Sequence, residues 1–354
     1  MKLSIICYLS DDKKLNQTTV EALEKMASYS LEHDNQVTVA GKHVDKKYNN
    51  GKKDSVTASY EVEIILNTDR VRDDRSWYEN VITRIGNHAF TSKVNKETYV
   101  SEQDAHQKMA EKASGDYIMI IHAGDDISSN LAEVFVKGNV QCYDMDTYMI
   151  TKAFHDETFG AFRNYKKVTD GEDIKSFYII DLKSKYDCFP FGFGGVIIRA
   201  EAFKKQSVDP AIGLEAERDF MLRLMAKAMK TCFLPYATLT AYEYEEHDNT
   251  FYRGLYMREW YFESITDFWM PFLQEMKVTY GSIPVFIQYN FMYSVMARFN
   301  GNMDNKNKHV IEEGHGEEYL ELIGQALRLI EENIMLNRNK VVDCITGDTM
   351  KWVY

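Results

Sequence analysis

The chain has 354 residues, of which 45% are hydrophobic and 27% are charged, and its 42 basic and 54 acidic residues give a net charge of −12. This composition excludes a fibrous or disordered protein and predicts two folding units or one elaborated unit. An acidic surface repels phosphate backbones, which excludes nucleic acid as the main partner.

The cysteine spacing and the apolar runs predict a cytoplasmic protein. The five cysteines are scattered along the chain: Cys7, Cys142, Cys188, Cys232 and Cys344. Without a CxxC pair they are typical of reduced thiols in the cytosol. The apolar run near the N-terminus is too short for a signal peptide, and the chain contains no run of about 18 apolar residues. We expect a soluble protein, with contact at the inner face of the membrane as the alternative.

The first part of the chain alternates strand and helix patterns. Residues 3–8, LSIICY, are a continuous apolar run that predicts a buried parallel strand. Residues 18–31 have helical periodicity, with Thr18 or Thr19 as the cap. Residues 41–54 are basic and aperiodic, which predicts an exposed loop, with phosphate binding as the alternative.

Two further strands end in acidic residues. The sequence of residues 61–69, EVEIILNTD, predicts a strand that ends at Asp69. A helix from residue 102 leads through Gly115 into a strand over residues 117–121 and then to Asp125. Ligands of open α/β sheets bind at the carboxyl ends of the strands, so these acidic tips predict a ligand site.

Asp125 and Asp126 form the acidic turn after this strand. Two adjacent carboxylates at a strand tip suit Mg²⁺ or Mn²⁺, which can neutralise a departing diphosphate. The alternative is that both residues cap a helix beginning near Ser128.

The order of these elements resembles family 2 glycosyltransferases of the GT-A fold. The resemblance lies in the helix that leads into residues 115–126, in LSIICYLSDD and in EVEIILNTD. It implies an α/β, Rossmann-like nucleotide-diphospho-sugar transferase domain over residues 1–250. The resemblance implies that Ser10, Asp11 and Asp69 hold the nucleobase and ribose of the donor. It also implies that Mn²⁺ or Mg²⁺ binds at the acidic turn.

The acidic turn departs from the family pattern at two positions. His122 stands where the family usually has Asp, and Gly124 stands where it often has a second Asp. The resemblance therefore assigns metal binding mainly to Asp125, with Asp126 and His122 as open alternatives.

Two later segments also resemble the family. Residues 189–203, FPFGFGGVIIRAEAF, resemble the segment beneath the acceptor sugar, where Gly194 and Gly195 would allow a close approach of ligand. The alternative is a loop that packs phenylalanine into the core. In residues 213–230 the resemblance places Glu217 at the position of the catalytic base, with Asp219 as the second candidate. These acids could equally stabilise a helix start through its dipole.

His247 follows a strand-like segment in a Tyr-x-x-His context. In the family such a histidine often reaches back to the metal or the diphosphate. A surface histidine is the alternative.

The region over residues 251–354 has a different character. Residues 251–300 contain 15 aromatic residues, and the spacing of apolar residues from Leu320 to Ile334 indicates one amphipathic helix. We expect a helical region whose aromatic residues form a core. The alternatives are an acceptor platform, or a patch that packs against a membrane or a second subunit. Residues 283–299 resemble the helical segment of enzymes that build teichoic-acid-like and capsular glycans of bacteria.

Together these features predict a metal-dependent inverting glycosyltransferase. It would move a sugar from a nucleotide-diphosphate donor, a UDP-sugar, to a surface glycan or a lipid-linked glycan. The alternative is a non-catalytic glycan- or nucleotide-binding protein of the same fold, in which His122 and Gly124 record the loss of the metal. Dehydrogenases and P-loop enzymes are disfavoured, because neither GxGxxG nor GxxxxGK[ST] follows a predicted strand.

Overall fold

A computed structural model describes most of the chain. The described residues are 1–40, 55–71, 75–86, 90–142, 145–154, 157–160, 177–186, 189–190, 192–241, 254, 256–303, 310–311 and 314–336. The chain divides into two compact units, which we describe separately. The first comprises Met1–Asp181, Pro190–Pro210 and Glu217–Tyr242, and the second Leu182–Phe189, Ala211–Ala216 and Glu243–Tyr354.

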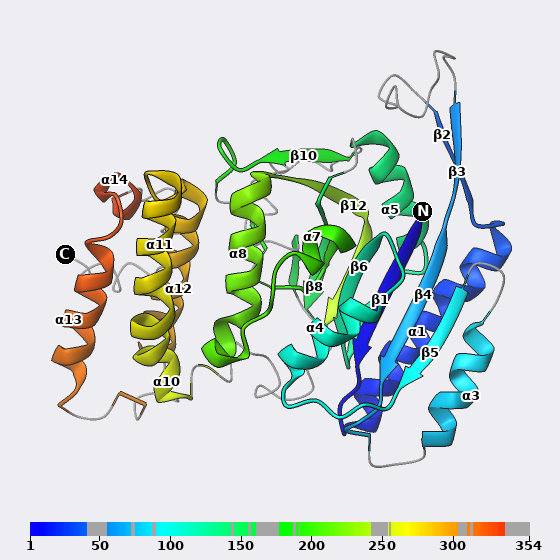
Figure 1. Ribbon diagram of the computed structural model, residues 1–354, viewed down its shortest axis with the longest axis horizontal. Coiled ribbons are helices and arrows are strands. Elements are labelled where there is room, and N and C mark those ends of the chain that lie inside the picture. The colour runs from blue at the N-terminus through cyan, green and yellow to red at the C-terminus, as the bar shows by residue number, and fades with distance from the viewer. Residues whose placement is uncertain are drawn as a thin grey trace. The chain divides into compact units, whose positions relative to one another are not determined.

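The first unit is built on a mixed β-sheet, which confirms the predicted α/β class (Figure 1). Within the described residues the main path of the sheet runs β10-β12-β8-β11-β6-β1-β4-β5. These strands are β1 (Lys2–Tyr8), β4 (Glu61–Asn67), β5 (Phe90–Asn95), β6 (Tyr117–His122), β8 (Thr147–Phe154), β10 (Tyr178–Asp181), β11 (Val196–Arg199) and β12 (Lys230–Ala241). The short strands β7 (Asp125–Ile127) and β9 (Glu157–Gly160) pair with β12 and β8, and β2 (Gln36–Ala40) pairs with β3 (Ser55–Ser59).

Strands β6, β1, β4 and β5 are parallel neighbours, whereas β11 runs antiparallel to β6 and β8. The interior of β1 is fully buried, as its continuous apolar sequence predicts for a central strand. The parallel arrangement brings the carboxyl ends of β1, β4 and β6 to the same edge of the sheet.

Helices connect these strands. They are α1 (Lys13–Glu32), α3 (Arg75–Ile85), α4 (Glu102–Lys112), α5 (Leu131–Gln141), α7 (Ala200–Lys204), the 3₁₀ helix η1 (Pro210–Glu215) and α8 (Ala216–Ala228). The start of α1 corrects the sequence prediction. Asp12 is its N-cap and accepts hydrogen bonds from the backbone N–H groups of Lys14 and Leu15, so Thr18 and Thr19 lie inside the helix.

Glu63 of β4 links the parallel strands through buried polar contacts. Its carboxylate accepts hydrogen bonds from Ser4 Oγ (2.6 Å), from the backbone N–H of Ser114 (2.8 Å) and from Lys93 Nζ (2.9 Å). Burial alone raises the pKa of Glu63, but these hydrogen bonds outweigh burial and lower the pKa to about 2. The ionised carboxylate therefore stabilises the junction of β1, β4, β5 and the turn before β6.

The described part of the second unit is helical, as predicted. Its helices are α10 (Arg258–Tyr261), the π-helix η2 (Ser264–Trp269), α11 (Met270–Tyr280), α12 (Val285–Met303), α13 (Gly316–Leu327) and α14 (Glu332–Met335). The prediction of one amphipathic helix from Leu320 to Ile334 was wrong, because α13 ends at Leu327 and a second helix, α14, begins at Glu332. Every helix within the described residues is too short or too polar to cross a lipid bilayer.

Aromatic packing forms the interior of the second unit. Trp269 is fully buried, and its ring lies 4.9 Å from that of Phe268 and 5.1 Å from that of Phe291. Trp260 is also buried. These aromatic residues form a core, which favours the first of the interpretations drawn from the sequence.

A buried ion pair lies within this aromatic core. Arg298 is fully buried, and its guanidinium donates to Glu215 Oε1 (3.0 Å), to Ser264 Oγ (2.6 Å) and to the backbone oxygen of Trp260 (2.8 Å). The same guanidinium lies 4.3 Å from the centre of the Trp260 ring. Glu215, one of the acids near the start of α8 in the sequence, is therefore a structural partner of Arg298.

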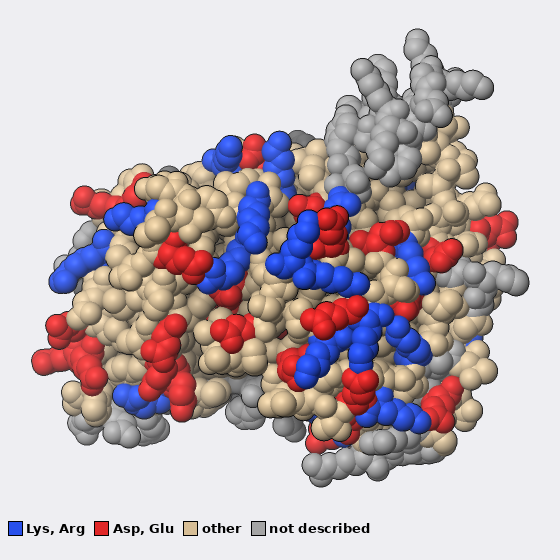
Figure 2. Space-filling view, viewed as in Figure 1, with Lys and Arg blue, Asp and Glu red and all other residues tan. Residues whose placement is uncertain are grey.

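Charged side chains intermingle on the surface. Figure 2 shows acidic and basic side chains interspersed on one face. Among the cysteines, Cys7, Cys142 and Cys232 are free and buried. The remaining two, and the basic segment 41–54, lie outside the described residues.

We predict that Arg298→Ala lowers the free energy of unfolding by about 3–5 kcal/mol, because the substitution leaves the Glu215 carboxylate buried without its counter-ion. Urea denaturation measures this change. Arg258→Ala is the control, since Arg258 forms an exposed pair with Glu263 and its loss should cost less than about 1 kcal/mol. Equal effects of the two substitutions would contradict the prediction.

We predict that Glu63→Gln destabilises the protein on the order of 3 kcal/mol at pH 7, because the folded state favours the ionised carboxylate. The folded-state pKa lies below the ordinary value of 4.5, so the stabilisation is present above about pH 4.5 and is lost as the pH falls towards 2. Urea denaturation of both proteins between pH 7 and pH 3 should show the difference shrinking. A difference that stays constant with pH would exclude this role for Glu63.

Candidate functional site

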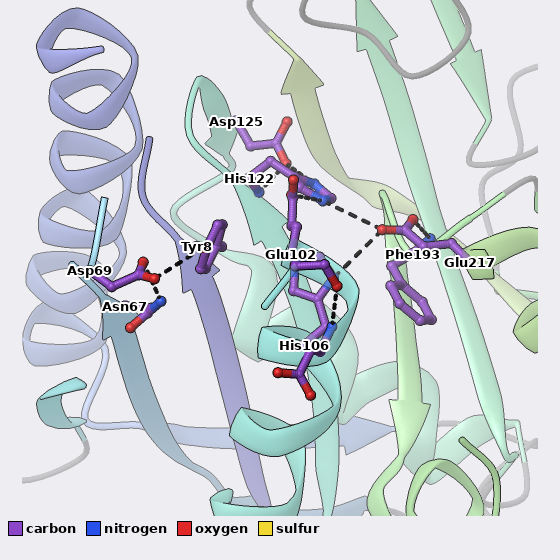
Figure 3. Close-up of polar contacts among 11 residues, drawn as sticks. Tyr8, Asn67, Asp69, Glu102, His106, His122, Asp125, Phe193 and Glu217 are labelled. Carbon is purple, nitrogen blue, oxygen red and sulfur yellow. Dashed lines mark hydrogen bonds and ion pairs between the residues drawn. The ribbon is translucent and has the colours of Figure 1, made fainter. Parts of the chain in front are cut away.

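Strand register aligns three chain segments at the carboxyl edge of the sheet. Tyr8, the last residue of β1, pairs with Asn67 of β4 on one side and with His122 of β6 on the other. The side chains at this edge form two groups, one around Asp69 and one around His122 (Figure 3).

The first group surrounds Asp69. Its carboxylate accepts hydrogen bonds from Asn67 Nδ2 (2.8 Å) and from the hydroxyl of Tyr8 (3.3 Å). The guanidinium of Arg70 lies 4.9 Å from the centre of the Tyr8 ring. Burial, opposed by Arg70 and reinforced by Asp69, raises the pKa of Tyr8 to about 12, so its hydroxyl remains a donor at neutral pH. Asp69 therefore lies at the tip of β4, as the sequence predicts.

Ser10 and Asp11 lie in the turn between β1 and α1. The backbone N–H of Ser10 donates to Asn16 Oδ1 (3.0 Å), and its hydroxyl accepts from the backbone N–H of Asp12 (3.1 Å). Asp11 is exposed. These contacts shape the turn and leave the Asp11 carboxylate in solvent.

The second group places three carboxylates around one imidazole. His122 Nε2 lies 3.3 Å from Glu102 Oε1 and 3.7 Å from Glu217 Oε1, and His122 Nδ1 lies 3.7 Å from Asp125 Oδ2. Glu102 and Glu217 come from the first turns of α4 and α8, whereas His122 and Asp125 flank the turn between β6 and β7. Three chain segments, α4, the β6–β7 turn and α8, thus contribute to this group.

The carboxylates and the imidazole stabilise one another's charged forms. Burial lowers the pKa of His122, but hydrogen bonding to Asp125 and Glu217 and the charge of Glu102 outweigh it and raise the pKa well above its ordinary value. Burial raises the pKa of Glu217, but His122, the charge of His106 and the backbone N–H of Phe193 outweigh it and lower the pKa to about 2. Glu217 is therefore ionised at neutral pH.

The loop before β11 holds Glu217 in place. Glu217 Oε2 accepts a hydrogen bond from the backbone N–H of Phe193 (3.2 Å). A Cβ atom on Gly192 would lie 2.8 Å from the same oxygen, so a larger residue at this position would displace the Glu217 carboxylate. The Phe193 ring is fully buried against Phe203 and Phe220, which anchors the loop.

The two predicted glycines lie in the same loop. Gly195 has a φ of +78°, a conformation that favours glycine. A Cβ atom on Gly194 would lie 2.8 Å from Lys152 Nζ. The loop packs Phe193 into the core, as the alternative interpretation of the sequence expects, and the approach of a ligand at Gly194 and Gly195 stays a prediction.

Asp219 lies apart from Glu217 on the same helix. Its carboxylate accepts from Arg223 Nε (2.8 Å), one turn along α8. Of these two acids, Glu217 lies beside His122 whereas Asp219 pairs with Arg223, which favours Glu217 over Asp219 as the candidate base.

Asp125 and Asp126 do not converge on one point. Asp125 is buried, and its carboxylate accepts from the backbone N–H of His122 (2.8 Å). Side chains alternate along a strand, and the charged neighbours of Asp126 are Lys25 and Glu21 of α1. Neither aspartate caps a helix, because residues 125–127 are strand β7 and Asn130 is the N-cap of α5.

The described residues at the strand tip therefore do not fit the oxygen-only site that Mg²⁺ or Mn²⁺ prefers. Only one carboxylate of the Asp125–Asp126 pair faces the edge, and it is engaged by a backbone N–H. The third predicted ligand, His247, lies outside the described residues.

Two residues of this site were absent from the sequence prediction. Glu102 and His106 lie one turn apart on α4, and together with His122 they form a group whose ligand atoms lie within 4.8 Å of one another and could hold a metal ion. The Glu-x-x-x-His spacing on the helix before β6 was the sequence signal that could have identified these two residues as metal ligands. The sequence prediction used only the apolar residues of that helix.

The comparisons with known proteins place the chain by its fold. The sequence matches no protein-family model and no curated protein. The structure has the fold of GT-A glycosyltransferases, which confirms the resemblance seen in the sequence.

The matching structures include several of TarS from S. aureus. The structure of its residues 1–349 with UDP-GlcNAc has a TM-score of 0.57 and 11% sequence identity, and the match covers 97% of this chain and 89% of that chain. The same fragment with UDP has a TM-score of 0.52 and 10% identity, over the same shares of the two chains. A third TarS structure has a TM-score of 0.51 and 10% identity, with 97% of this chain and 54% of that chain covered. The TM-scores show a shared fold, and at these low identities the matches show the fold alone.

Proposed function

We propose that the chain is an inverting glycosyltransferase that moves a sugar from a UDP-sugar donor to a surface glycan or a lipid-linked glycan. The observation that carries the proposal is the ionised Glu217, held by the Phe193 N–H at the carboxyl edge of a GT-A sheet. A carboxylate in this position is what the acceptor of a transfer reaction requires.

The group around Asp69 is the proposed nucleoside site. The Asp69 carboxylate can accept hydrogen bonds from ribose hydroxyls or from a base, while Asn67 and Tyr8 hold it in position. Arg70, close to the Tyr8 ring, adds positive charge for a phosphate. The TarS structures with UDP and UDP-GlcNAc support a uridine nucleotide as the first donor to test.

In the proposed reaction an acceptor hydroxyl attacks the anomeric carbon from the side opposite the diphosphate. The new C–O bond forms as the bond between the anomeric carbon and the phosphate oxygen breaks, and the electron pair of that bond leaves with the nucleoside diphosphate. The hydroxyl proton passes to Glu217. Glu217 can accept it because the carboxylate is ionised at neutral pH.

The departing diphosphate needs positive charge nearby. The side chain of His122 lies at the same edge with 33% of its surface exposed, so its imidazolium can face an anionic ligand while remaining close to Glu217.

A non-catalytic nucleotide- or glycan-binding protein is the second candidate. It is favoured by Gly124, which replaces a family carboxylate, and by the hydrogen bond that engages Asp125. Both candidates would bind a nucleotide, but only the transferase would transfer a sugar, so turnover distinguishes them.

We predict that a UDP-sugar raises the melting temperature of the protein and that Asp69→Ala weakens binding about tenfold or more, because the variant loses a charge-assisted hydrogen bond to the nucleoside. A thermal-shift screen of UDP-, GDP- and other nucleotide sugars, with and without Mn²⁺, measures both effects. Asp267→Ala, in the second unit, is the control and should bind like the unmodified protein. Absence of any nucleotide-dependent shift would exclude the proposed donor class.

We predict that Glu217→Gln lowers turnover by about 10²–10⁴-fold while donor affinity stays close to that of the unmodified protein, because glutamine keeps the shape of the side chain and removes the base. Product formation with the donor found in the screen measures turnover. Glu201→Gln, an exposed residue paired with Lys205, is the control and should retain full activity. Full activity of Glu217→Gln would move the base to Asp219 or Asp69, and donor binding without any turnover would favour the binding protein.

A further inference from the structure

His106 is a buried imidazole without a hydrogen bond. Its side chain is fully buried, and neither ring nitrogen forms a hydrogen bond with any described residue. The rings of Tyr8, His122 and Phe193 surround it at 5.3–6.2 Å between ring centres. Buried polar groups are almost always satisfied, so an unsatisfied imidazole among aromatic rings requires an explanation.

Two other ligand atoms converge on this imidazole. His106 Nε2 lies 3.8 Å from Glu102 Oε1, which in turn lies 3.3 Å from His122 Nε2. Glu102 and His106 share a face of α4, because residues four apart lie above one another on a helix. Ser101 fixes the start of that helix by accepting a hydrogen bond from the backbone N–H of Asp104 (3.1 Å), and β6 supplies His122.

We propose that Glu102, His106 and His122 form a binding site for a divalent transition-metal ion. Bonds of about 2.0–2.2 Å around a tetrahedral zinc ion place neighbouring ligand atoms about 3.4 Å apart. The two distances to Glu102 Oε1 lie close to this spacing, and all three ligand atoms lie within 4.8 Å of one another. A bound ion would satisfy the buried imidazole.

The donor atoms decide which class of metal fits. Two imidazole nitrogens and one carboxylate oxygen suit Zn²⁺ and its first-row neighbours, whereas Mg²⁺ and Ca²⁺ prefer oxygen ligands throughout. The site is therefore distinct from the oxygen site that the sequence predicted at Asp125 and Asp126. It also does not depend on the proposed transferase activity.

Three protein ligands leave one coordination position for another group. Glu217 Oε1 lies 3.7 Å from His122 Nε2 and 3.6 Å from His106 Nδ1, so this carboxylate borders the site. The side chains of Glu102 and His122 are 30% and 33% exposed. A water molecule or an anionic oxygen can therefore reach the metal from the carboxyl edge of the sheet.

Zinc titration of the untagged full-length chain tests the proposal. The protein is stripped with a chelator, the chelator is removed, and Zn²⁺ binding is measured by isothermal titration calorimetry without donor or acceptor. We expect one equivalent of Zn²⁺ to bind, His106→Leu to abolish this binding and Glu102→Gln to weaken it at least about tenfold. Mg²⁺ at the same concentrations should not bind at this site. His33→Leu, which changes an exposed histidine stacked on Tyr29, is the control and should bind Zn²⁺ normally.

A purely structural role for His106 gives a different result. A structural role predicts that the metal-free His106→Leu protein melts at a lower temperature than the unmodified protein. Under our proposal the ring nitrogens form no hydrogen bond in the metal-free protein, so this variant should melt at the same or a higher temperature. If that variant fails to fold, Glu102→Gln decides the question, because its side chain is partly exposed and keeps its shape. Absence of zinc binding, unchanged binding in both site variants, loss of binding in the His33 control, or equal binding of Mg²⁺ would overturn the proposal. The transferase proposal stands or falls by the donor and turnover measurements instead.

Discussion

The candidate site depends on one electrostatic constraint, the crowding of carboxylates around the His122 imidazole at the end of β6. Three carboxylates, those of Glu102, Asp125 and Glu217, lie within 4 Å of the His122 imidazole. Carboxylates brought together in a partly buried region stay ionised only when positive charge lies among them. A proton on His122 supplies that charge in the absence of other ions, and a metal ion could replace the proton. The residue that departs from the GT-A pattern is therefore the one around which its neighbours are organised.

The sheet makes this arrangement possible. Parallel pairing of β1 with β4 and β6 places Tyr8, Asn67 and His122 in one row, so two polar groups with different chemistry share an edge. The group around Asp69 contains a carboxylate held by Asn67 and Tyr8, and the group around His122 contains an ionised Glu217 beside an imidazole. The buried Phe193 loop then sets the position of the Glu217 carboxylate.

A buried cation also organises the second unit, with a different consequence. Arg298 is fully enclosed, and its hydrogen bonds to Glu215, Ser264 and the Trp260 backbone satisfy much of its guanidinium. This pair is inaccessible to solvent, so its role is to stabilise the packing of aromatic helices. The His122 group retains partial exposure, which lets it meet a ligand. The same pairing of opposite charges thus serves structure in one unit and a candidate function in the other.

The sequence alone determined the α/β class, the helical C-terminal region and the acidic tip at Asp69, and it predicted Glu217, with Asp219 as the second candidate, as the base. These depend on local periodicity and on short motifs, which a single chain displays directly. Only the tertiary structure decided which carboxylates meet. Asp125 and Asp126 are adjacent in sequence, yet strand alternation turns them apart, whereas Glu102, His122 and Glu217 are distant in sequence and are brought together by sheet register and helix packing. Contacts between distant segments depend on the path of the backbone in three dimensions, which local sequence patterns do not specify.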